Sequence, residues 1–322
     1  MKILYEVSRI AEDIRTMRIR GAGRIARAAA LGLKIAAEKF EGKDGEEFRR
    51  YIKDVAEYLR STRPTAVSLP NALTFIVHRL MISPSEDLEE LRSTVVKSAE
   101  EFIEYSKKAT ENIGKIGAKR IEDGDKVLTH CNSSAALSVI IHAFKEGKDI
   151  KVYNTETRPK FQGYITARKL LNIGIKTTLI PDSSVRAFMK KIDKVIVGAD
   201  TVAANGVVVN KIGTSQIALA AKEANVDFYV AAETYKFSPM TVLGEYIVIE
   251  ERSPKEIVRN MKIPENINIR NPAFDVTPAE YIDAIITEMG IIPPQAAILI
   301  LKEHYGWAIR DYLIRELSID EA

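Results

Sequence analysis

The stretch KVLTHCNSSAALSVIIHAFKEGKDIKVYN, residues 126–154, holds the repeating unit that decides the fold. KVLTH predicts a short buried strand, SSAALSVIIHAFKEG predicts a helix, and IKVYN predicts a second strand. A helix between two such apolar strands is the unit of a parallel sheet. The alternation continues, with further strands predicted at KTTLIP, KVIVGAD, DFYVAA and EYIVIE, residues 176–181, 194–200, 227–232 and 245–250. We therefore predict an α/β fold in which helices cover both faces of a parallel sheet.

The first third of the chain has a different pattern, which is helical over residues 8–120. One run, EEFRRYIKDVAEYLRS at residues 46–61, stops shortly before Pro64, because proline disfavours helix in the residue that precedes it. We therefore predict two domains, a helical one over 1–120 and a parallel-sheet one over 121–322.

Composition excludes several classes of protein. The net charge is only +3, so nothing in it calls for nucleic acid or an anionic membrane surface as a partner. A single cysteine cannot form an intrachain disulfide, which is typical of a reducing compartment. Charged residues appear within the first few positions, whereas a signal peptide has an apolar core there. No apolar run reaches the roughly 18 residues that a membrane span needs. We expect a cytoplasmic protein.

GAGRIA, residues 21–26, matches the dinucleotide-binding pattern G-x-G-x-x-A. That pattern works only directly after a strand, and here the preceding residues predict a helix. We therefore do not expect NAD binding. The glycines instead mark a helix start whose free backbone amides could hold a phosphate.

Cys131 is the only cysteine, and it lies between the first predicted strand and the helix predicted after it. A lone cysteine is usually a small buried hydrophobe. At a helix N-terminus, however, the helix dipole would lower the pKa of the thiol and make it reactive. Ser133 and Ser134 add hydroxyl donors beside it. His130 points to the opposite face of its strand, so we interpret it as structural.

Asp200 ends the apolar run VIVGAD. An aspartate there could simply cap the following turn. Half desolvated at the end of a buried strand, its carboxyl would instead have a raised pKa that suits proton donation. Ligands of parallel α/β sheets bind beyond the carboxyl ends of the strands, where both Cys131 and Asp200 fall. The two residues are therefore a candidate acid/base pair.

Several cations stand next to glycine, proline or a strand end. One such residue would be read as a solvated charge, but a set of them is better explained by phosphate binding. They are Arg20, Arg63, Arg158, Lys211 and Lys236, and Asn210 and Gln162 could bind sugar hydroxyls. No cluster has the spacing of metal ligands, so we expect neither metal nor cofactor. The residues suit cofactor-free proton transfer on a phosphorylated small molecule, such as an aldose–ketose isomerisation.

Five stretches carry a resemblance to a known family. They are THCNSS, NTETRPKFQG, VIVGADTVAANGVVVNKIGTSQIALAAK, FYVAAETYKFSP and NPAFDVTPAEYIDAIITEMGII. With them the chain resembles the family that unites methylthioribose-1-phosphate isomerases, ribose-1,5-bisphosphate isomerases of archaeal type, and the regulatory subunits of translation initiation factor 2B. The resemblance covers nearly the whole chain. It implies a helical N-terminal domain followed by a Rossmann-like domain.

The branch is indicated by particular residues. In the isomerases the catalytic pair matches Cys131 and Asp200, and the regulatory subunits typically lack the cysteine. The methylthioribose enzymes usually have R-G-A-P-A-I and C-N-A/T-G where this chain has RGAGRIA and CNSS. A 5-phosphate also suits the hydroxyls of Ser133 and Ser134 and the charge of Lys236, whereas a methylthio tail would need an apolar pocket. The resemblance therefore implies a ribose-1,5-bisphosphate isomerase, with the methylthioribose enzyme and a non-catalytic regulator as alternatives.

The resemblance also implies roles and assembly. Asp200 would protonate the ring oxygen and Cys131, as thiolate, would take the C2 proton, although the two roles could be exchanged. The implied substrate contacts are Arg20, Gly21, Ala22, Gly23, Arg63, Ser133, Ser134, Ala135, Asn210, Lys211 and Lys236. Members form dimers, and some form hexamers as trimers of dimers, so we expect a homo-oligomer with residues 271–292 near the dimer contact. The implied context is nucleoside monophosphate salvage.

Overall fold

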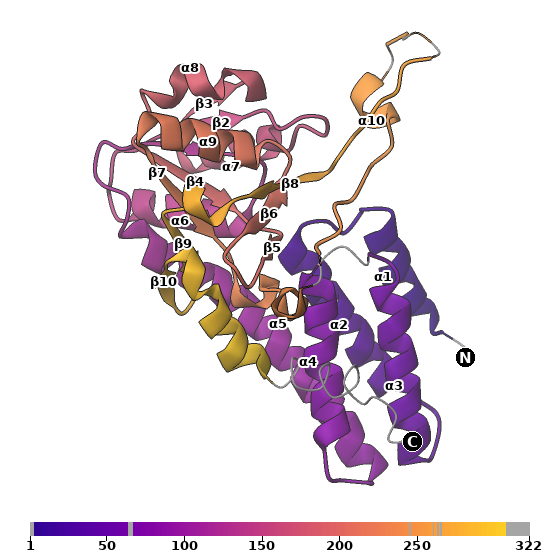
Figure 1. Cartoon of the computed structure of the whole chain (residues 1–322). Coiled ribbons are helices and arrows are strands. Elements are labelled where there is room, and N and C mark those ends of the chain that lie inside the picture. The colour runs from indigo at the N-terminus through magenta and orange to yellow at the C-terminus, as the bar shows by residue number, and fades with distance from the viewer. Residues whose placement is uncertain are drawn as a thin grey trace. The chain divides into compact units, whose positions relative to one another are not determined.

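The computed structural model describes residues 3–306 except 64–66, 245, 260, 263 and 265. The chain divides into two compact units, Met1–Lys108 and Ala109–Ala322, and the division falls inside one long helix (Figure 1). The predicted domain limits of 1–120 and 121–322 stay a proposal.

The N-terminal unit is built from helices, as predicted. They are α1 (Tyr5–Arg15), α2 (Ala22–Glu38), α3 (Gly45–Arg60), α4 (Ser68–Ile82) and the first part of α5 (Leu88–Ala118). Buried small residues line α2, and Gly32 lets Leu59 of α3 approach so closely that a Cβ there would already touch it at 3.0 Å. Asp44 caps α3 by accepting a hydrogen bond from the backbone N–H of Glu47. α3 ends at Arg60, before Pro64.

A seven-stranded sheet forms the centre of the C-terminal unit, in the order β10-β9-β7-β4-β1-β2-β3. All neighbours pair in parallel except β10, which is antiparallel to β9. The strands are β1 (Lys126–Thr129), β2 (Lys151–Thr155), β3 (Lys176–Ile180), β4 (Lys194–Gly198), β7 (Asp227–Ala231), β9 (Ala284–Thr287) and β10 (Gly290–Ile292). The chain leaves β1 toward β2 on one side and later returns to β4 on the other. The β1/β4 boundary is therefore the topological switch point of a doubly wound sheet.

Helices cover both faces of this sheet, as predicted. They are α6 (Ser134–Lys145), α7 (Gln162–Ile173), α8 (Val185–Met189) and α9 (Thr214–Ala224). Successive residues of a strand contribute to different cores: Val127 of β1 lies in the core that includes residues of α6, and Leu128 in the core that includes residues of α8 and α9. Burial on both faces explains why these strands are continuous apolar runs.

A second, antiparallel sheet holds β5 (Thr201–Val202), β6 (Val208–Lys211) and β8 (Phe274–Thr277). It directly follows β4, so the chain turns from the end of the main sheet into this small one. Its strands were not separately predicted from the sequence, because each is short and the two-residue β5 has no periodicity to detect.

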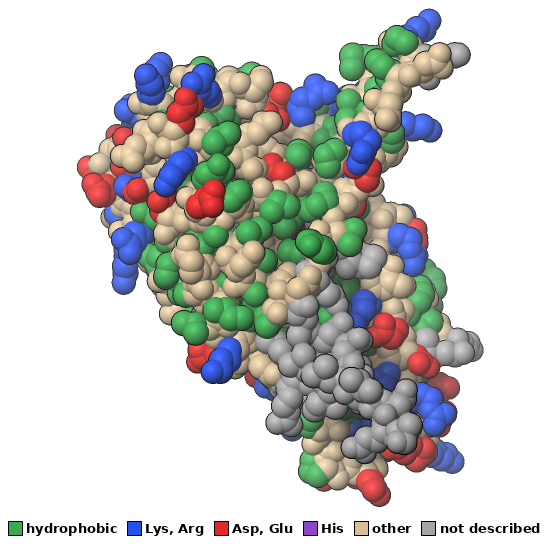
Figure 2. Space-filling model, in the orientation of Figure 1, with side chains coloured by type: hydrophobic (Ala, Val, Ile, Leu, Met, Phe, Trp, Pro, Cys, Tyr) green, Lys and Arg blue, Asp and Glu red, His purple; other side chains and the backbone are tan. Residues whose placement is uncertain are grey.

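The strand predicted at residues 245–250 is wrong. Residues 246–250 form no strand and belong to an arm that carries the short helix α10 (Lys255–Val258) and projects from the C-terminal unit (Figure 1). Tyr246 is 96% exposed and Val248 70% exposed, and Figure 2 shows apolar and basic side chains along this arm. The apolar alternation is real, but pairing beside it is limited to its end, where the carbonyl of Glu250 accepts from the N–H of Ala273 and Glu251 forms an isolated antiparallel bridge with Pro272. None of the described helices is long and apolar enough to cross a membrane.

Candidate active site

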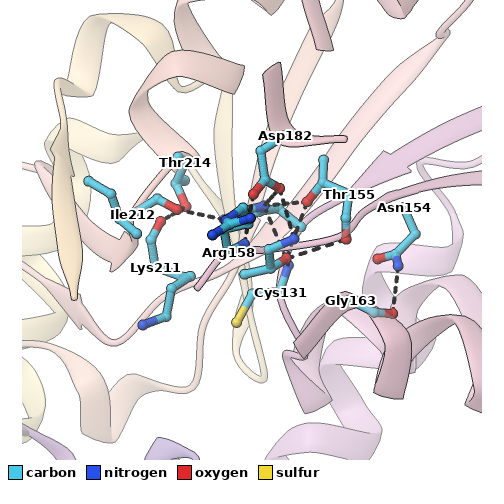
Figure 3. A network of polar contacts seen from close by, with 12 residues as sticks. Cys131, Asn154, Thr155, Arg158, Gly163, Asp182, Lys211, Ile212 and Thr214 are labelled. Carbon is cyan, nitrogen blue, oxygen red and sulfur yellow. Dashed lines mark hydrogen bonds and ion pairs between the residues drawn. The ribbon is translucent and has the colours of Figure 1, made fainter. Parts of the chain in front are cut away.

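Cys131 occupies the turn between β1 and α6, with a left-handed backbone of φ +65°. Its N–H donates to the hydroxyl of Thr157 at 2.9 Å, and its carbonyl accepts from the hydroxyl of Thr166 at 2.7 Å. Ser133 then caps α6 by accepting from the N–H of Ala136. Both peptide groups of Cys131 are therefore held by residues that follow β2, as Figure 3 shows for part of this network.

The electrostatics of Cys131 differ from the sequence expectation. Burial raises the pKa of its thiol to about 11; the Lys211 charge lowers it, and the Asp200 and Asp182 charges raise it further. The expected lowering by the helix dipole is therefore wrong for the free protein, because desolvation of the thiolate outweighs it. A raised pKa means that Cys131 is a thiol, not a thiolate, at neutral pH in the free protein. The charges of Lys211, Asp200 and Asp182 all act on it.

Asp200 and Lys211 come from two chain segments that meet beyond the end of β4. The backbone N–H of Asp200 donates to the carbonyl of Val209 in β6 at 2.9 Å. Lys211 ends β6, where its ammonium donates to the carbonyl of Ala273 at 2.7 Å and lies 4.7 Å from the centre of the Phe274 ring. Figure 3 shows the side chains of Lys211 and Cys131 pointing to the same side of the network.

Ser133 packs against the end of β4. A Cβ on Gly198 would lie less than 3.0 Å from the Ser133 hydroxyl, which is closer than real Cβ atoms approach. The glycine of VIVGAD therefore makes room for the start of α6. Together with the groups around Cys131, this contact places Ser133, Asp200 and Lys211 around the β1/β4 switch point.

His130 is buried, and burial lowers the pKa of its imidazole to about 4. Its Nε2 lies 2.9 Å from the carbonyl of Ile212, which can only accept, so Nε2 carries the proton. Nδ1 then accepts from the Thr155 hydroxyl at 2.5 Å. Both ring nitrogens are used inside the fold, which agrees with the structural interpretation of His130.

Asp182, which directly follows β3 and Pro181, was missed from the sequence. Its carboxylate accepts from the N–H of Thr157 at 2.8 Å and from the N–H of Arg158 at 2.7 Å, and it lies 4.0 Å from Nδ1 of His130. A signal was available, because Asp182 follows a predicted strand as Cys131 and Asp200 do. Thr157 gave no such signal, since its hydrogen bonds join segments far apart in sequence.

Asn210 and Gln162, expected to bind sugar hydroxyls, lie at the ends of different elements. Asn210 is buried in β6 and donates to the hydroxyl of Thr214 at 3.0 Å. Gln162 opens α7, and its buried Oε1 has no hydrogen-bond partner among the described residues. Ser134 and Ala135 form the first turn of α6.

Lys236 lies just past β7 and is buried beside Glu233, with 2.6 Å between its Nζ and the carboxylate. Oε2 makes no aligned hydrogen bond, so the contact is chiefly an ion pair. Burial alone would raise the pKa of Glu233. The Lys236 charge and hydrogen bonds, including one from Thr110, nevertheless hold this pKa below its ordinary value. The ammonium of Lys236 is therefore already paired within the fold.

The remaining predicted contacts belong to the N-terminal unit. Gly21, with φ +91°, is the N-cap of α2, and Ala22 and Gly23 form its first turn. GAGRIA thus opens a helix without a preceding strand, so the structural context of a dinucleotide fingerprint is missing there. Arg20 directly precedes this cap and Arg63 follows α3. Their part in a substrate site stays a prediction.

Comparison with known proteins now identifies the family. Residues 18–294 match the model of the initiation factor 2 subunit family. The chain belongs to this family. It is 54% identical, over 96% of its length and 98% of the relative's, to a ribose 1,5-bisphosphate isomerase of Thermococcus kodakarensis.

Solved structures of other proteins share the fold. The translation initiation factor eIF-2B of Pyrococcus horikoshii matches with a TM-score of 0.78 and 34% identity, over 92% of this chain and 99% of that one. The 5-methylthioribose 1-phosphate isomerase of the same organism matches with a TM-score of 0.78 and 34% identity, over 94% and 88%. Because a protein named as a factor and one named as an enzyme fit equally well, the fold alone does not separate catalysis from regulation.

Among the described residues, no group of His, Cys, Asp and Glu is arranged to hold a metal ion. The polar groups around Cys131 instead form a hydrogen-bonded frame for one thiol, with the Asp200 carboxyl and the Lys211 ammonium beside it. Such an arrangement can move protons and stabilise negative charge on a bound molecule.

Proposed function

We propose that this chain is a ribose 1,5-bisphosphate isomerase, which converts α-ribose 1,5-bisphosphate into ribulose 1,5-bisphosphate without a cofactor. The observation that carries the proposal is the presence of Cys131, Asp200 and Lys211 around one switch point, in a chain 54% identical to a protein of that name. Among enzyme classes this is an intramolecular oxidoreductase, an aldose–ketose isomerase.

The substrate sets the chemistry that the residues must perform. Phosphate on C1 prevents the sugar ring from opening spontaneously to a free aldehyde. The ring oxygen must be protonated as its bond to C1 breaks, and the C2 proton must be removed to give an enol phosphate. Protonation of C1, with loss of the enol proton from the C2 hydroxyl, then gives the ketose. One acid and one base suffice.

We assign Asp200 as the acid on the ring oxygen and Cys131 as the base on C2. A thiolate with a pKa near 11 is a strong base, and Lys211 stabilises it when it forms. In the exchanged assignment, Cys131 donates the proton that it already carries and Asp200 is the base. The two assignments differ in how kcat/KM depends on pH.

Phosphate binding is assigned to cations and amides. Lys211, Lys236 and the first amides of α6 would hold phosphate oxygens, each charge-assisted contact contributing about 1.5–3 kcal/mol. Gln162 and Asn210 would bind sugar hydroxyls. Arg20, Arg63 and the amides of residues 21–23 remain predicted substrate contacts.

Two other functions remain as alternatives: methylthioribose-1-phosphate isomerase, and a regulator that binds sugar phosphates or nucleotides without turnover. Identity favours the bisphosphate enzyme, at 54% for the relative from Thermococcus kodakarensis against 42% for a methylthioribose-1-phosphate isomerase of Acetivibrio thermocellus. The hydroxyls of Ser133 and Ser134 and the charge of Lys236 also suit a second phosphate better than a methylthio group. We further propose a cytoplasmic homo-oligomer, with residues 271–292 near the dimer contact, that acts in nucleoside monophosphate salvage.

The direct experiment is an NMR assay of the purified protein with α-ribose 1,5-bisphosphate in deuterated water. Formation of ribulose 1,5-bisphosphate is expected, and deuterium at C1 would reveal exchange of the abstracted proton with solvent. Turnover of methylthioribose 1-phosphate alone would support the sister enzyme. Turnover of neither, with binding retained, would support the regulator.

A further inference from the structure

Cys131 and Thr157 share an unusual backbone conformation. Cys131 has φ +65° and Thr157 has φ +60°, both in the left-handed region that residues other than glycine seldom adopt. For a β-branched residue such as threonine this is a marked outlier. The two strained residues follow different strands, β1 and β2, and a hydrogen bond joins them. Strain of this kind persists only where surrounding contacts enforce it, and it concentrates at functional sites.

The contacts that enforce it at Cys131 are two threonine hydroxyls. Thr157 Oγ1 accepts from the Cys131 N–H at 2.9 Å, and Thr166 Oγ1 donates to the Cys131 carbonyl at 2.7 Å. Both threonines are buried. The peptide groups on either side of the Cys131 Cα are therefore anchored to the segment that runs from β2 into α7.

Thr157 is itself fixed from two directions. Its N–H donates to Asp182 at 2.8 Å, and its carbonyl accepts from the N–H of Phe161 at 2.8 Å. Asp182 also accepts from the N–H of Arg158, so one carboxylate beyond β3 orders the start of the loop (Figure 3). A continuous chain of hydrogen bonds thus runs from the end of β3 through Thr157 to Cys131.

We propose that Thr157 is a positioning residue for Cys131, whose hydroxyl holds the Cys131 backbone in the left-handed conformation and so fixes the direction of the thiol. A return of Cys131 to ordinary negative φ would swing its Cα–Cβ bond away from the present direction. The thiol would then lose its placement relative to Asp200 and Lys211. This role rests on the proposed isomerase only in that Cys131 is the group positioned for catalysis.

The test compares Thr157→Val, which removes the hydroxyl but keeps the shape, with Thr157→Ser, which keeps the hydroxyl. Thr277→Val is the matched control, because Thr277 is also a buried threonine and its hydroxyl has no hydrogen-bond partner among the described residues. We expect Thr157→Val to lower kcat by about 10- to 100-fold with little change in KM, since misplacement of a reacting group by about 1 Å has effects of this size. Thr157→Ser and the control should stay within about threefold of wild type.

A second readout needs no turnover. Cys131 is the only cysteine, so the rate of alkylation by iodoacetamide against pH reports on this thiol alone. Thr157→Val should shift that profile by about half a pH unit or more, because the thiol moves relative to its charged neighbours. Thr157→Ser should retain the wild-type profile. Should Thr157→Val fail to fold, Thr166→Val removes the other hydroxyl and should shift the profile in its place.

Wild-type kcat and a wild-type alkylation profile in Thr157→Val would overturn the proposal. Equal impairment of Thr157→Ser and Thr157→Val would overturn it too, since the hydroxyl would then not matter. A shifted alkylation profile in a protein whose wild type turns over no sugar phosphate would support the positioning role and contradict the isomerase.

Discussion

Gly198, the last residue of β4, lies so close to the Ser133 hydroxyl that a Cβ added to the glycine would come within 3.0 Å of it. This contact joins the strand that precedes Asp200 to the N-cap of the helix that follows Cys131. The close contact between Gly198 and Ser133 therefore helps to fix the position of Asp200 relative to Cys131.

Gly198→Ala should therefore displace Ser133 and loosen the start of α6. We expect a loss of about 1–3 kcal/mol in the free energy of unfolding, as for other overpacked sites, and a larger proportional loss in kcat/KM. Urea unfolding and the isomerase assay measure the two effects. Gly306→Ala is the control, because no atom of the described residues lies within 4 Å of a Cβ there. Equal behaviour of both variants would contradict the proposed contact.

Cys131→Ser should bind substrate and lose most turnover. The hydroxyl occupies nearly the same space as the thiol but is a far weaker acid, so proton transfer at C2 or at the ring oxygen would fail. A loss of about 10²–10⁴-fold in kcat is typical of the removal of an acid or base. Calorimetric titration with the bisphosphate should give nearly the wild-type affinity. Full activity in this variant would remove Cys131 from the mechanism.

The raised pKa of Cys131 separates the two assignments of acid and base. If Cys131 acts as thiolate in the free enzyme, kcat/KM should increase about tenfold per pH unit above neutrality, until it levels near pH 11. If Cys131 is the acid, no such increase should occur and kcat/KM should decline near pH 11. The measurement is kcat/KM between pH 6 and about 11, with alkylation of the thiol as a parallel readout. Alkylation that levels near neutral pH would contradict the raised pKa itself.

His130 should make the fold less stable in mild acid. The pKa is about 4 in the folded protein, against 6.5 for an unperturbed imidazole, because burial opposes the charge and Lys211 repels it, although Asp182 favours it. The folded state thus binds the proton less readily than the unfolded state. The stabilising contribution is complete above pH 6.5 and is lost as pH falls toward 4, by about 3 kcal/mol in total. Urea unfolding of wild type and His130→Asn at several pH values should show the difference between them shrinking over this window. A difference independent of pH would contradict it.

The strand ends that carry Cys131 and Asp200 could be predicted, because buried parallel strands are short apolar runs and the first polar residue marks where each one ends. The central sheet and its covering helices followed from the same alternation. Asp182 carried the same signal, because it follows the strand predicted at 176–181. Thr157 could not be found this way, since its importance lies in hydrogen bonds between loops that the sheet brings together. The wrong strand at 245–250 has a related cause: its apolar pattern is that of a strand, but its backbone pairing is limited to a contact at Glu250 and an isolated bridge at Glu251.

The direction of the Cys131 pKa shift could not be predicted from the sequence either. The helix start at Ser134 was visible in the chain, whereas the desolvation of the thiol depends on everything packed around it. Local electrostatics could be anticipated, and the larger effect, burial, could not.

The ion pair between Lys236 and Glu233 should contribute to the stability of the fold. Both side chains are buried, and breaking a buried ion pair leaves one uncompensated charge. Glu233→Gln should therefore lower the free energy of unfolding by about 3–5 kcal/mol, and the double variant Glu233→Gln with Lys236→Met should recover much of that loss. Urea unfolding of the two single variants and the double variant measures the coupling. Additive losses would mean that the two charges do not stabilise one another.

The same lysine is proposed to bind a phosphate, so Lys236→Met should also weaken binding of ribose 1,5-bisphosphate more than binding of ribose 1-phosphate or ribose 5-phosphate. Because Glu233 already pairs with Lys236, substrate phosphate would have to share or replace that carboxylate as partner. Loss of one charge-assisted contact corresponds to about 10- to 100-fold in the dissociation constant. Calorimetric titration of wild type and variant with the three ligands compares these affinities. An unchanged preference for the bisphosphate would show that the second phosphate binds elsewhere and that Lys236 serves only the fold.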